Sequence, residues 1–297
     1  MPGPGSVVGF VGTGVMGAPM AGHLLDAGYR LRVYNRTRAK AEPLLARGAA
    51  WCDTPGETAE GADAVITMVG YPADVEQVYL APGGIVERAG SGSYLLDMTT
   101  STPSLAVRIA QAAAARGLHA LDAPVSGGDV GAREARLTIM VGGDAEAFAA
   151  VEGLLKVLGP NVVLQGGPGA GQHTKMANQI AIADTILGVC ESLAYAEASG
   201  LDPWRVLDSI GAGSAGSWQL ANYAPRMLRG EFGPGFYVKH FIKDMRIARD
   251  EADAMGIHLP GLCLVLGLFE EHARRGGEND GIHALYLLYK ERAVPGA

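Results

Sequence analysis

The amino-acid sequence predicts an α/β protein with an N-terminal, doubly wound parallel sheet, a long interdomain helix and an all-helical C-terminal part. Three observations lead to this fold class. A glycine-rich turn joins the opening apolar run to a helix, further apolar runs then alternate with helical stretches, and strand-like alternation is absent after residue 201. Alternating strands and helices are typical of parallel sheets covered on both faces. We expect one domain over residues 1–165 and a second over 166–297 that begins with the long helix.

Composition narrows the class of protein. The 297 residues can form two domains with real cores, and the 48% of apolar residues suits a soluble globular chain. A net charge of −7 argues against general binding of nucleic acids or anionic membranes. Cys52, Cys190 and Cys263 are too far apart to predict a disulfide framework or a metal site, and no apolar run reaches the ~18 residues of a membrane span. We expect a cytoplasmic protein without a signal peptide.

The opening motif is a G-x-G-x-x-G turn. It follows the apolar run Ser6–Val11 and precedes residues 18–27, which read as a helix. The motif consists of Gly12, Thr13, Gly14, Val15, Met16 and Gly17. Its glycines permit a tight turn and the close approach of a pyrophosphate, while free N–H groups at the helix start face the phosphates. The context of strand, turn and helix favours dinucleotide binding over a merely structural turn.

The end of the next predicted strand, Arg30–Tyr34, bears on the choice of cofactor. Sites selective for NAD usually carry an acidic residue here to hold the ribose 2′-hydroxyl. This chain has Asn35, Arg36 and Thr37 instead, which could bind a 2′-phosphate. NADP is therefore favoured over NAD. The same three residues could also cap the helix expected near Ala39, and both interpretations can hold together.

Two further strands continue the rhythm at residues 64–69 and 94–97, each followed by a turn and a helix. Ligands of doubly wound sheets bind beyond the carboxyl ends of the strands. Val69, Gly70, Thr99 and Thr100 occupy those ends, so we expect them to border the cofactor. Thr100 could equally serve only as a turn or cap residue.

The stretch His119–Gly131 combines an apolar strand with a glycine-rich turn at Ser126, Gly127 and Gly128. Consecutive glycines expose backbone N–H groups that can form a nest for an anion. The serine hydroxyl adds a donor, so the stretch suits a small carboxylate, although a plain turn is the alternative. We expect a strand over 132–141, a helix over 145–158 and a last strand over 162–165.

A long helix is predicted over residues 169–200, because a Pro-Gly-rich turn opens it and a glycine closes it. After its first turn it is apolar on nearly every face, which predicts burial on all sides. Lys175 and Asn178 lie near its start at i and i+3 and share a face. A lysine against buried surface is costly unless it is paired or neutral. A lysine that merely reaches to solvent is the bland alternative.

The remainder of the chain predicts helices at residues 202–210, 237–255, 260–275 and 283–291. The apolar stripe at 286–289 favours a core or a subunit interface. His173, His240, His258 and His283 lie at no metal-ligand spacing, so no metal is expected.

Together these motifs resemble the β-hydroxyacid dehydrogenase family, which includes 3-hydroxyisobutyrate dehydrogenases and semialdehyde reductases. The resemblance covers essentially the whole chain and rests on the segments 9–20, 122–132, 169–179 and 243–245. It implies an N-terminal Rossmann domain, a long joining helix and a helical C-terminal domain. It also implies that Ser126, Gly127 and Gly128 bind the substrate carboxylate. Lys175 would be the catalytic lysine, Asn178 its partner on the substrate, and Lys243 with Asp244 the pair that returns to the cofactor.

The resemblance implies an NAD(P)-dependent oxidoreductase that acts on a small β-hydroxy acid or its semialdehyde and forms a homo-oligomer, a dimer or tetramer. Lys175 would be the general acid and base, with its pKa lowered by burial and a nearby cationic nicotinamide. Two departures favour an NADPH-dependent glyoxylate, succinic or tartronate semialdehyde reductase as the alternative. Residues 133–137 lack the glycine that the family usually has there, and residues 35–37 lack an acidic side chain. A non-catalytic dinucleotide-binding module is the alternative from another class.

Overall fold

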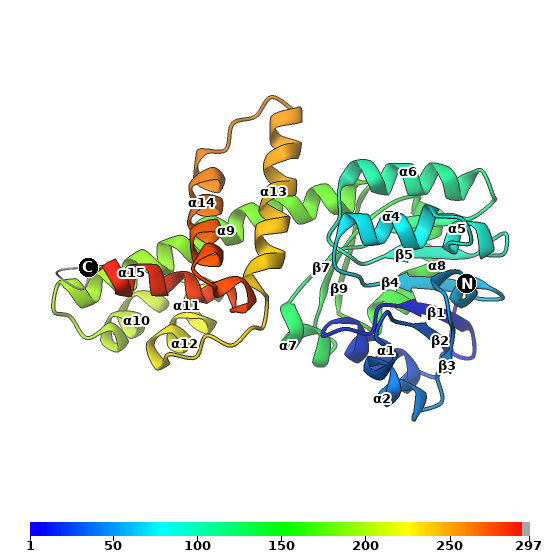
Figure 1. The fold of residues 1–297 in the computed structure, drawn as a ribbon, viewed down its shortest axis with the longest axis horizontal. Helices are drawn as coiled ribbons and strands as arrows, with labels where there is room; N and C mark the ends of the chain where they lie inside the picture. Colours follow the sequence, from blue (N-terminus) through cyan, green and yellow to red (C-terminus); the bar gives the residue numbers. More distant parts are fainter. Residues whose placement is uncertain (293–297) are drawn as a thin grey trace. The chain divides into compact units, whose positions relative to one another are not determined.

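The computed structural model describes residues 1–292 of the chain, which divide into two compact units, 1–175 and 176 onward (Figure 1). Within the described residues the first unit holds one nine-stranded sheet. Its strands are β1 Val7–Val11, β2 Arg30–Tyr34, β3 Ala50–Trp51, β4 Ala64–Thr67, β5 Tyr94–Asp97, β6 His119–Asp122, β7 Val125–Ser126, β8 Thr138–Gly142 and β9 Asn161–Gly166. Its helices are α1 Gly17–Asp26, α2 Glu42–Leu45, α3 Pro55–Ala59, α4 Pro72–Leu80, α5 Ile85–Arg88, α6 Pro103–Ala114, α7 Gly128–Arg133 and α8 Ala145–Lys156.

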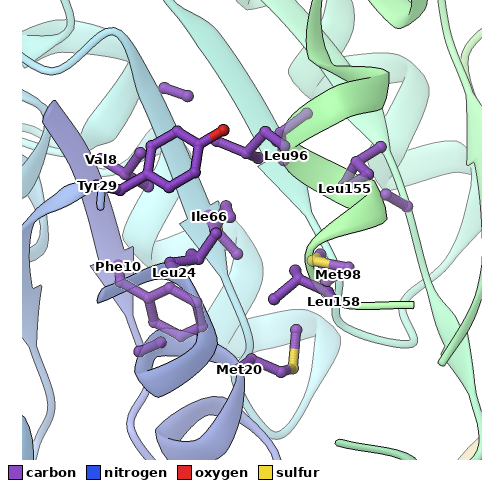
Figure 2. Packing of buried hydrophobic residues seen from close by; sticks show 14 of the residues in the cluster. Val8, Phe10, Met20, Leu24, Tyr29, Ile66, Leu96, Met98, Leu155 and Leu158 are labelled. Atoms are coloured by element: carbon purple, nitrogen blue, oxygen red, sulfur yellow. The ribbon is translucent and has the colours of Figure 1, made fainter. Parts of the chain in front are cut away.

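The sheet has the doubly wound order predicted from the sequence. Strands run in the order β3-β2-β1-β4-β5-β6-β8-β7, with β9 beside β8, and the pairs from β3 to β6 are parallel. Successive side chains of a strand point to opposite faces. Ile66 and Leu96 accordingly pack under α1, α2 and α8 (Figure 2), whereas Val65 and Leu95 pack under α3, α4, α5 and α6. Both faces are therefore covered, as a parallel sheet requires.

The region after β6 differs from the prediction. The strand expected over 132–141 is wrong in its first half, where the chain forms α7 and a turn through Ala135 with a φ of 51°. The physical reason is that residues 128–136 are rich in glycine and charge, and the apolar run begins only at Leu137. β8 then pairs antiparallel with β7 and β6, so the sheet is mixed at this end.

Helix α9, Ala170–Ala198, is a single 29-residue helix as predicted. The expected burial on all sides is wrong. From Met176 onward one stripe is buried, at positions three or four residues apart such as Ala183, Ile186 and Leu193, while Tyr195 is 74% exposed. The exposed face carries small residues, which can stay uncovered at little cost, together with the acidic side chains of Asp184 and Glu191.

The second unit is helical throughout its described residues. Its helices after α9 are α10 Pro203–Gly211, α11 Trp218–Asn222, α12 Ala224–Arg229, α13 Val238–Ala254, α14 Pro260–Arg274 and α15 Leu287–Arg292, with short 3-10 turns at Gly277–Asn279 and Ile282–Tyr286. Phe241, Phe269 and Tyr286 pack with α9 in one core, as expected for the 286–289 stripe. None of the helices in residues 1–292 is long and apolar enough to cross a membrane.

Candidate active site

The glycine-rich turn after β1 is shaped by backbone contacts. Gly12 has a φ of 98°, and a Cβ at this position would lie 2.2 Å from the carbonyl oxygen of Met68. A Cβ on Gly17 would lie 1.9 Å from the carbonyl oxygen of Gly12. Gly14, by contrast, has no atom within 4 Å of its Cβ position. Gly12 and Gly17 therefore let neighbouring backbone segments pack closely at the turn, whereas Gly14 leaves open space above it.

The turn also fits the phosphates of a dinucleotide in its polar groups. The Thr13 side chain is 1% exposed, and its hydroxyl has no hydrogen-bond partner among residues 1–292. The Thr13 N–H donates to Oδ1 of Asn35 at 3.0 Å, which ties the turn to the end of β2. Val15 is exposed beside it. An orphaned buried hydroxyl is costly unless a ligand or water satisfies it, so this cradle suits a bound pyrophosphate.

The residues after β2 have separate partners. Asn35 Nδ2 donates to the carbonyl oxygen of Thr37 at 2.9 Å. Thr37 precedes a 3-10 turn, Arg38–Lys40, and its hydroxyl does not cap that turn. The Arg36 side chain is 79% exposed, and its Nη1 lies 3.3 Å from Oδ1 of Asp74. Arg36 is therefore an exposed cation at the carboxyl edge of the sheet, loosely paired with an acid on α4.

Strands β4 and β5 are direct neighbours, so Val69, Gly70 and Thr100 come to the same edge as the glycine-rich turn. The N–H of Val69 donates to the hydroxyl of Thr99 at 3.0 Å. Thr99 is also among the residues that the sequence predicts at this edge. It lies next to Thr100 and fastens the two loops to each other.

A buried carboxylate lies beneath these loops at the end of β5. Asp97 Oδ1 accepts hydrogen bonds from the Thr67 hydroxyl at 2.8 Å and from the Thr99 N–H at 3.1 Å. The pKa of Asp97 is raised from 3.8 to about 6. Burial is the largest cause, the hydrogen bonds from Thr67 and Thr99 oppose it, and the charge of the nearby Asp122 contributes to the rise.

Asp122, at the end of the neighbouring β6, binds the N–H groups at the start of α9. Its Oδ1 accepts from the N–H of Gly169 and its Oδ2 from the N–H of Gln172, both at 2.8 Å. Burial raises the pKa of Asp122, and these N–H donors lower it. The first N–H groups of a helix lack partners within the helix, so a carboxylate here caps α9.

The side chain of Gln172 makes a second attachment between α9 and the sheet. Its Oε1 accepts from the N–H of Ser101 at 2.9 Å, and its Nε2 donates to the carbonyl oxygen of Thr99 at 2.8 Å. Gly171 allows this close approach, because a Cβ there would lie 2.5 Å from the carbonyl oxygen of Met140. An alanine at this position would push the first turn of α9 off the sheet.

Lys175 follows one turn later and is 6% exposed. Its position in the first unit depends on the attachments of Asp122, Gly171 and Gln172. A lysine is rarely this buried in a folded protein. The first turns of α9 therefore place a buried lysine in the first unit, shortly after the residues that attach the helix to the sheet.

The other motif residues of the first unit lie on β7 and the turn that follows it. Ser126 is half-buried, while Gly127 and Gly128 have φ values of 131° and 62° that glycine adopts without strain. The charged residues of the following segment are paired. Arg133 Nη1 lies 2.5 Å from Asp129 Oδ2, and Arg136 pairs with Glu134. The charges on this rim are thus largely neutralised.

In the second unit, Asn178 and Asp244 belong to one chain of hydrogen bonds. Asn178 Nδ2 donates to Gln179 Oε1 at 2.8 Å, and Gln179 Nε2 donates to Asp244 Oδ2 at 2.6 Å. Lys243 Nζ lies 3.0 Å from Asp244 Oδ1 and forms an ion pair with it. Asp244 is 1% exposed, so its carboxylate acts on its neighbours rather than on solvent.

Comparisons with known proteins show the family to which the chain belongs. A family model described as NAD binding domain of 6-phosphogluconate dehydrogenase matches residues 7–167, and one described as NAD-binding of NADP-dependent 3-hydroxyisobutyrate dehydrogenase matches residues 169–289. The chain belongs to the β-hydroxyacid dehydrogenase family. An uncharacterized oxidoreductase of Bacillus subtilis is 56% identical over 95% of this chain and 98% of its own length.

Two further relatives carry assigned activities. The 2-hydroxy-3-oxopropionate reductase of Escherichia coli is 38% identical over 91% of this chain and 92% of its own length. The structure of Mycobacterium tuberculosis 3-hydroxyisobutyrate dehydrogenase with L-serine aligns with a TM-score of 0.88 and 27% identity, covering 96% of this chain and 99% of that one. This member of the β-hydroxyacid dehydrogenases is thus an NAD(P)-dependent oxidoreductase acting on CH–OH donors.

Sequence reasoning missed the groups of this dehydrogenase that support its motifs, namely Asp97, Asp122, Gln172 and Gln179. A signal for the first two existed. Strands β5 and β6 both end in Leu-Asp after an apolar run, so each places a carboxylate at the carboxyl edge. No such pattern marks the glutamines, because their partners are far away in the chain.

Asp97→Asn tests the buried carboxylate. The folded state holds the Asp97 proton more tightly than the unfolded state, so Asp97 lowers stability as the pH rises through the interval between the two pKa values. The asparagine of the variant cannot ionise, so the variant should not show this pH-dependent decrease in the free energy of unfolding. The difference between the free energies of unfolding of the variant and of wild type should therefore increase by on the order of 3 kcal/mol from about pH 4 to pH 7.

Urea denaturation of both proteins across that pH range measures the difference. Asp26→Asn, which neutralises an exposed carboxylate paired with Arg47, is the control and should follow the wild-type curve. A constant difference between Asp97→Asn and wild type would show that Asp97 does not titrate in this interval.

Proposed function

We propose that this enzyme interconverts a small β-hydroxy acid and its semialdehyde, as a 3-hydroxyisobutyrate dehydrogenase does, with Lys175 as general acid and base. The burial of Lys175 at the anchored start of α9 carries the proposal. Among side chains of that first turn, a buried amine is the group suited to proton transfer near neutral pH. Asn178 follows at i+3 on the same helix and can hydrogen-bond the same substrate.

The chemistry divides between cofactor and chain. Bound NAD(P) supplies the hydride acceptor or donor. Lys175 Nζ takes the hydroxyl proton when the alcohol is oxidised and returns it when the aldehyde is reduced. Ser126, Gly127 and Gly128 bind the substrate carboxylate through N–H groups and the serine hydroxyl. The glycine-rich turn of residues 12–17 and the edge formed by Val69, Gly70 and Thr100 would hold the dinucleotide, with Lys243 a further cofactor contact.

A reductase of glyoxylate, succinic semialdehyde or tartronate semialdehyde is the second candidate. The similarity to the Escherichia coli reductase and the absence of an acidic side chain at residues 35–37 favour it. A panel of 3-hydroxyisobutyrate, glycerate, 3-hydroxypropionate and serine with their aldehydes, extended by glyoxylate and succinic semialdehyde and run with both cofactors, distinguishes the two. The first candidate requires the highest kcat/KM on 3-hydroxyisobutyrate or its semialdehyde, and the second requires it on glyoxylate, succinic semialdehyde or tartronate semialdehyde with NADPH.

Lys175→Met tests the acid–base role, because methionine keeps the apolar stem and removes the amine. We expect kcat to fall by about 10²–10⁴-fold. Binding of the reduced cofactor, followed by its fluorescence, should be preserved because the glycine-rich turn is unchanged. Lys156→Met, at an exposed position of α8, is the matched control and should keep wild-type kcat. A Lys175→Met enzyme with more than half the wild-type activity would remove Lys175 from the mechanism.

Arg36→Ala tests the preference for NADP. Only NADP carries the 2′-phosphate that a guanidinium can bind through two hydrogen bonds. We expect the Kd for NADP to rise at least about tenfold, as for loss of a charged hydrogen bond, and the Kd for NAD to change little. Arg38→Ala, two residues on and stacked over Trp51, is the control. Equal losses for both cofactors would contradict the proposed role.

We further propose that the chain forms a homo-oligomer through the helical unit, and that it acts in the cytoplasm. No residue of the amphipathic helix α10 is buried, and Tyr195, Leu201, Trp204 and Trp218 on and beside it are exposed. A second copy of the chain is the partner that suits these apolar side chains. Light scattering should give a mass above that of one chain, and Trp204→Glu should lower it. Met255→Glu, at an exposed site elsewhere in the unit, should not. A monomeric wild type would refute the assembly.

A further inference from the structure

The hydrogen bonds from Asn178 through Gln179 to Asp244 form a buried relay in the second unit. Gln179 is fully buried and Asp244 nearly so, and the two links measure 2.8 and 2.6 Å. The proposed catalytic steps use neither Gln179 nor the Asp244 carboxylate. A buried polar chain of this kind is costly unless each member satisfies the next, so its arrangement has a single low-energy form.

The polarity of the relay follows from its carboxylate end. An ionised carboxylate only accepts hydrogen bonds, so Gln179 must turn its Nε2 toward Asp244. Its Oε1 then faces Asn178, which must turn its Nδ2 toward Gln179. The reversed orientation would set two acceptor oxygens 2.6 Å apart with no proton between them. Asp244 therefore determines which way the Asn178 amide points, although the two side chains do not touch.

We propose that Asp244 and Gln179 are positioning residues that lock the Asn178 amide in one orientation. Asn178 then offers its Oδ1 and its one remaining N–H to the reactants on defined sides. This inference rests on the proposed function, in which Asn178 contacts the substrate. It assigns Asp244 a task within the protein, beyond the cofactor contact that the family resemblance implies.

An exchange of the two groups provides a direct test. Asp244→Asn removes the acceptor-only end, so the relay can run in either direction. Gln179→Glu sets two carboxylates against each other. The double variant Gln179→Glu/Asp244→Asn restores the polarity, because the amide introduced at position 244 would donate to the new carboxylate, which still accepts from Asn178. Net charge is the same as in wild type.

We expect each single variant to lower kcat about tenfold at saturating cofactor, as for loss of one buried hydrogen bond, and the double variant to return to within about threefold of wild type. Glu270→Gln is the matched control. Its carboxylate on α14 accepts from Arg246 on α13, and its loss should leave kcat unchanged. A double variant as slow as the product of the singles would overturn the proposal.

NMR of the ¹⁵N-labelled full-length protein detects the side-chain amide groups of the relay and needs no substrate. Variants of Asn178 and Gln179 assign the two amide signals. Asp244→Asn should shift both NH₂ groups, and the double variant should restore that of Asn178. An Asn178 amide signal whose chemical shift does not change in Asp244→Asn would show that the relay stops at Gln179. Restored signals without restored kcat would show that the orientation of Asn178 does not serve catalysis. If no substrate of the panel reacts, the proposed function fails while the NMR result still decides whether the relay exists.

Discussion

The carboxylate of Asp122 accepts hydrogen bonds from the N–H groups of Gly169 and Gln172, and the placement of the start of α9 depends on these bonds. A helix of 29 residues begins with backbone donors that the helix itself cannot satisfy. Supplying the acceptor from the end of β6 joins the sheet edge to the helix start with two short bonds. Lys175 lies one turn further on, so its location follows from this cap and from the glycine that permits it.

Two neighbouring carboxylates, Asp97 and Asp122, are buried at the same edge of the sheet, which costs free energy. Burial raises the pKa of both Asp97 and Asp122, and donors from Thr67, Thr99 and the first residues of α9 offset part of the cost. An apolar edge would avoid that cost but would leave the loops that follow β4, β5 and β6 without anchors. These loops carry the motif residues, so a satisfied polar network exchanges some stability for defined loop positions.

Helix α9 serves both units through different parts of its length. Its first turns belong to the first unit, where Gln172 and Lys175 are buried, and its later turns line the core of the second with Ile186 and Leu193. Asn178 and Gln179 come just after the division and begin the relay to Asp244.

The sequence alone determined the doubly wound sheet, the long helix and the family, because periodicity and glycine spacing are local properties of the chain. Short apolar runs predicted the bounds of β1, β4 and β5 to within two residues, and the strand and helix on either side of the G-x-G-x-x-G turn made that motif specific. The roles of Lys175, Asn178 and the serine-glycine turn came from motif resemblance and stay predictions. Residues 132–136 were misread because glycine and charge interrupted a pattern that resumes only at Leu137.

Only the tertiary structure decided which polar groups meet. Asp122 reaches Gln172 across 50 positions, and Gln179 reaches Asp244 across 65. No local pattern encodes such pairs, because their partners are chosen by the packing of strands and helices that are distant in the chain. The uncovered face of α9 has the same origin. An apolar sequence indicates that a helix can be buried. The number of elements that the fold packs around the helix decides how much of its surface is buried.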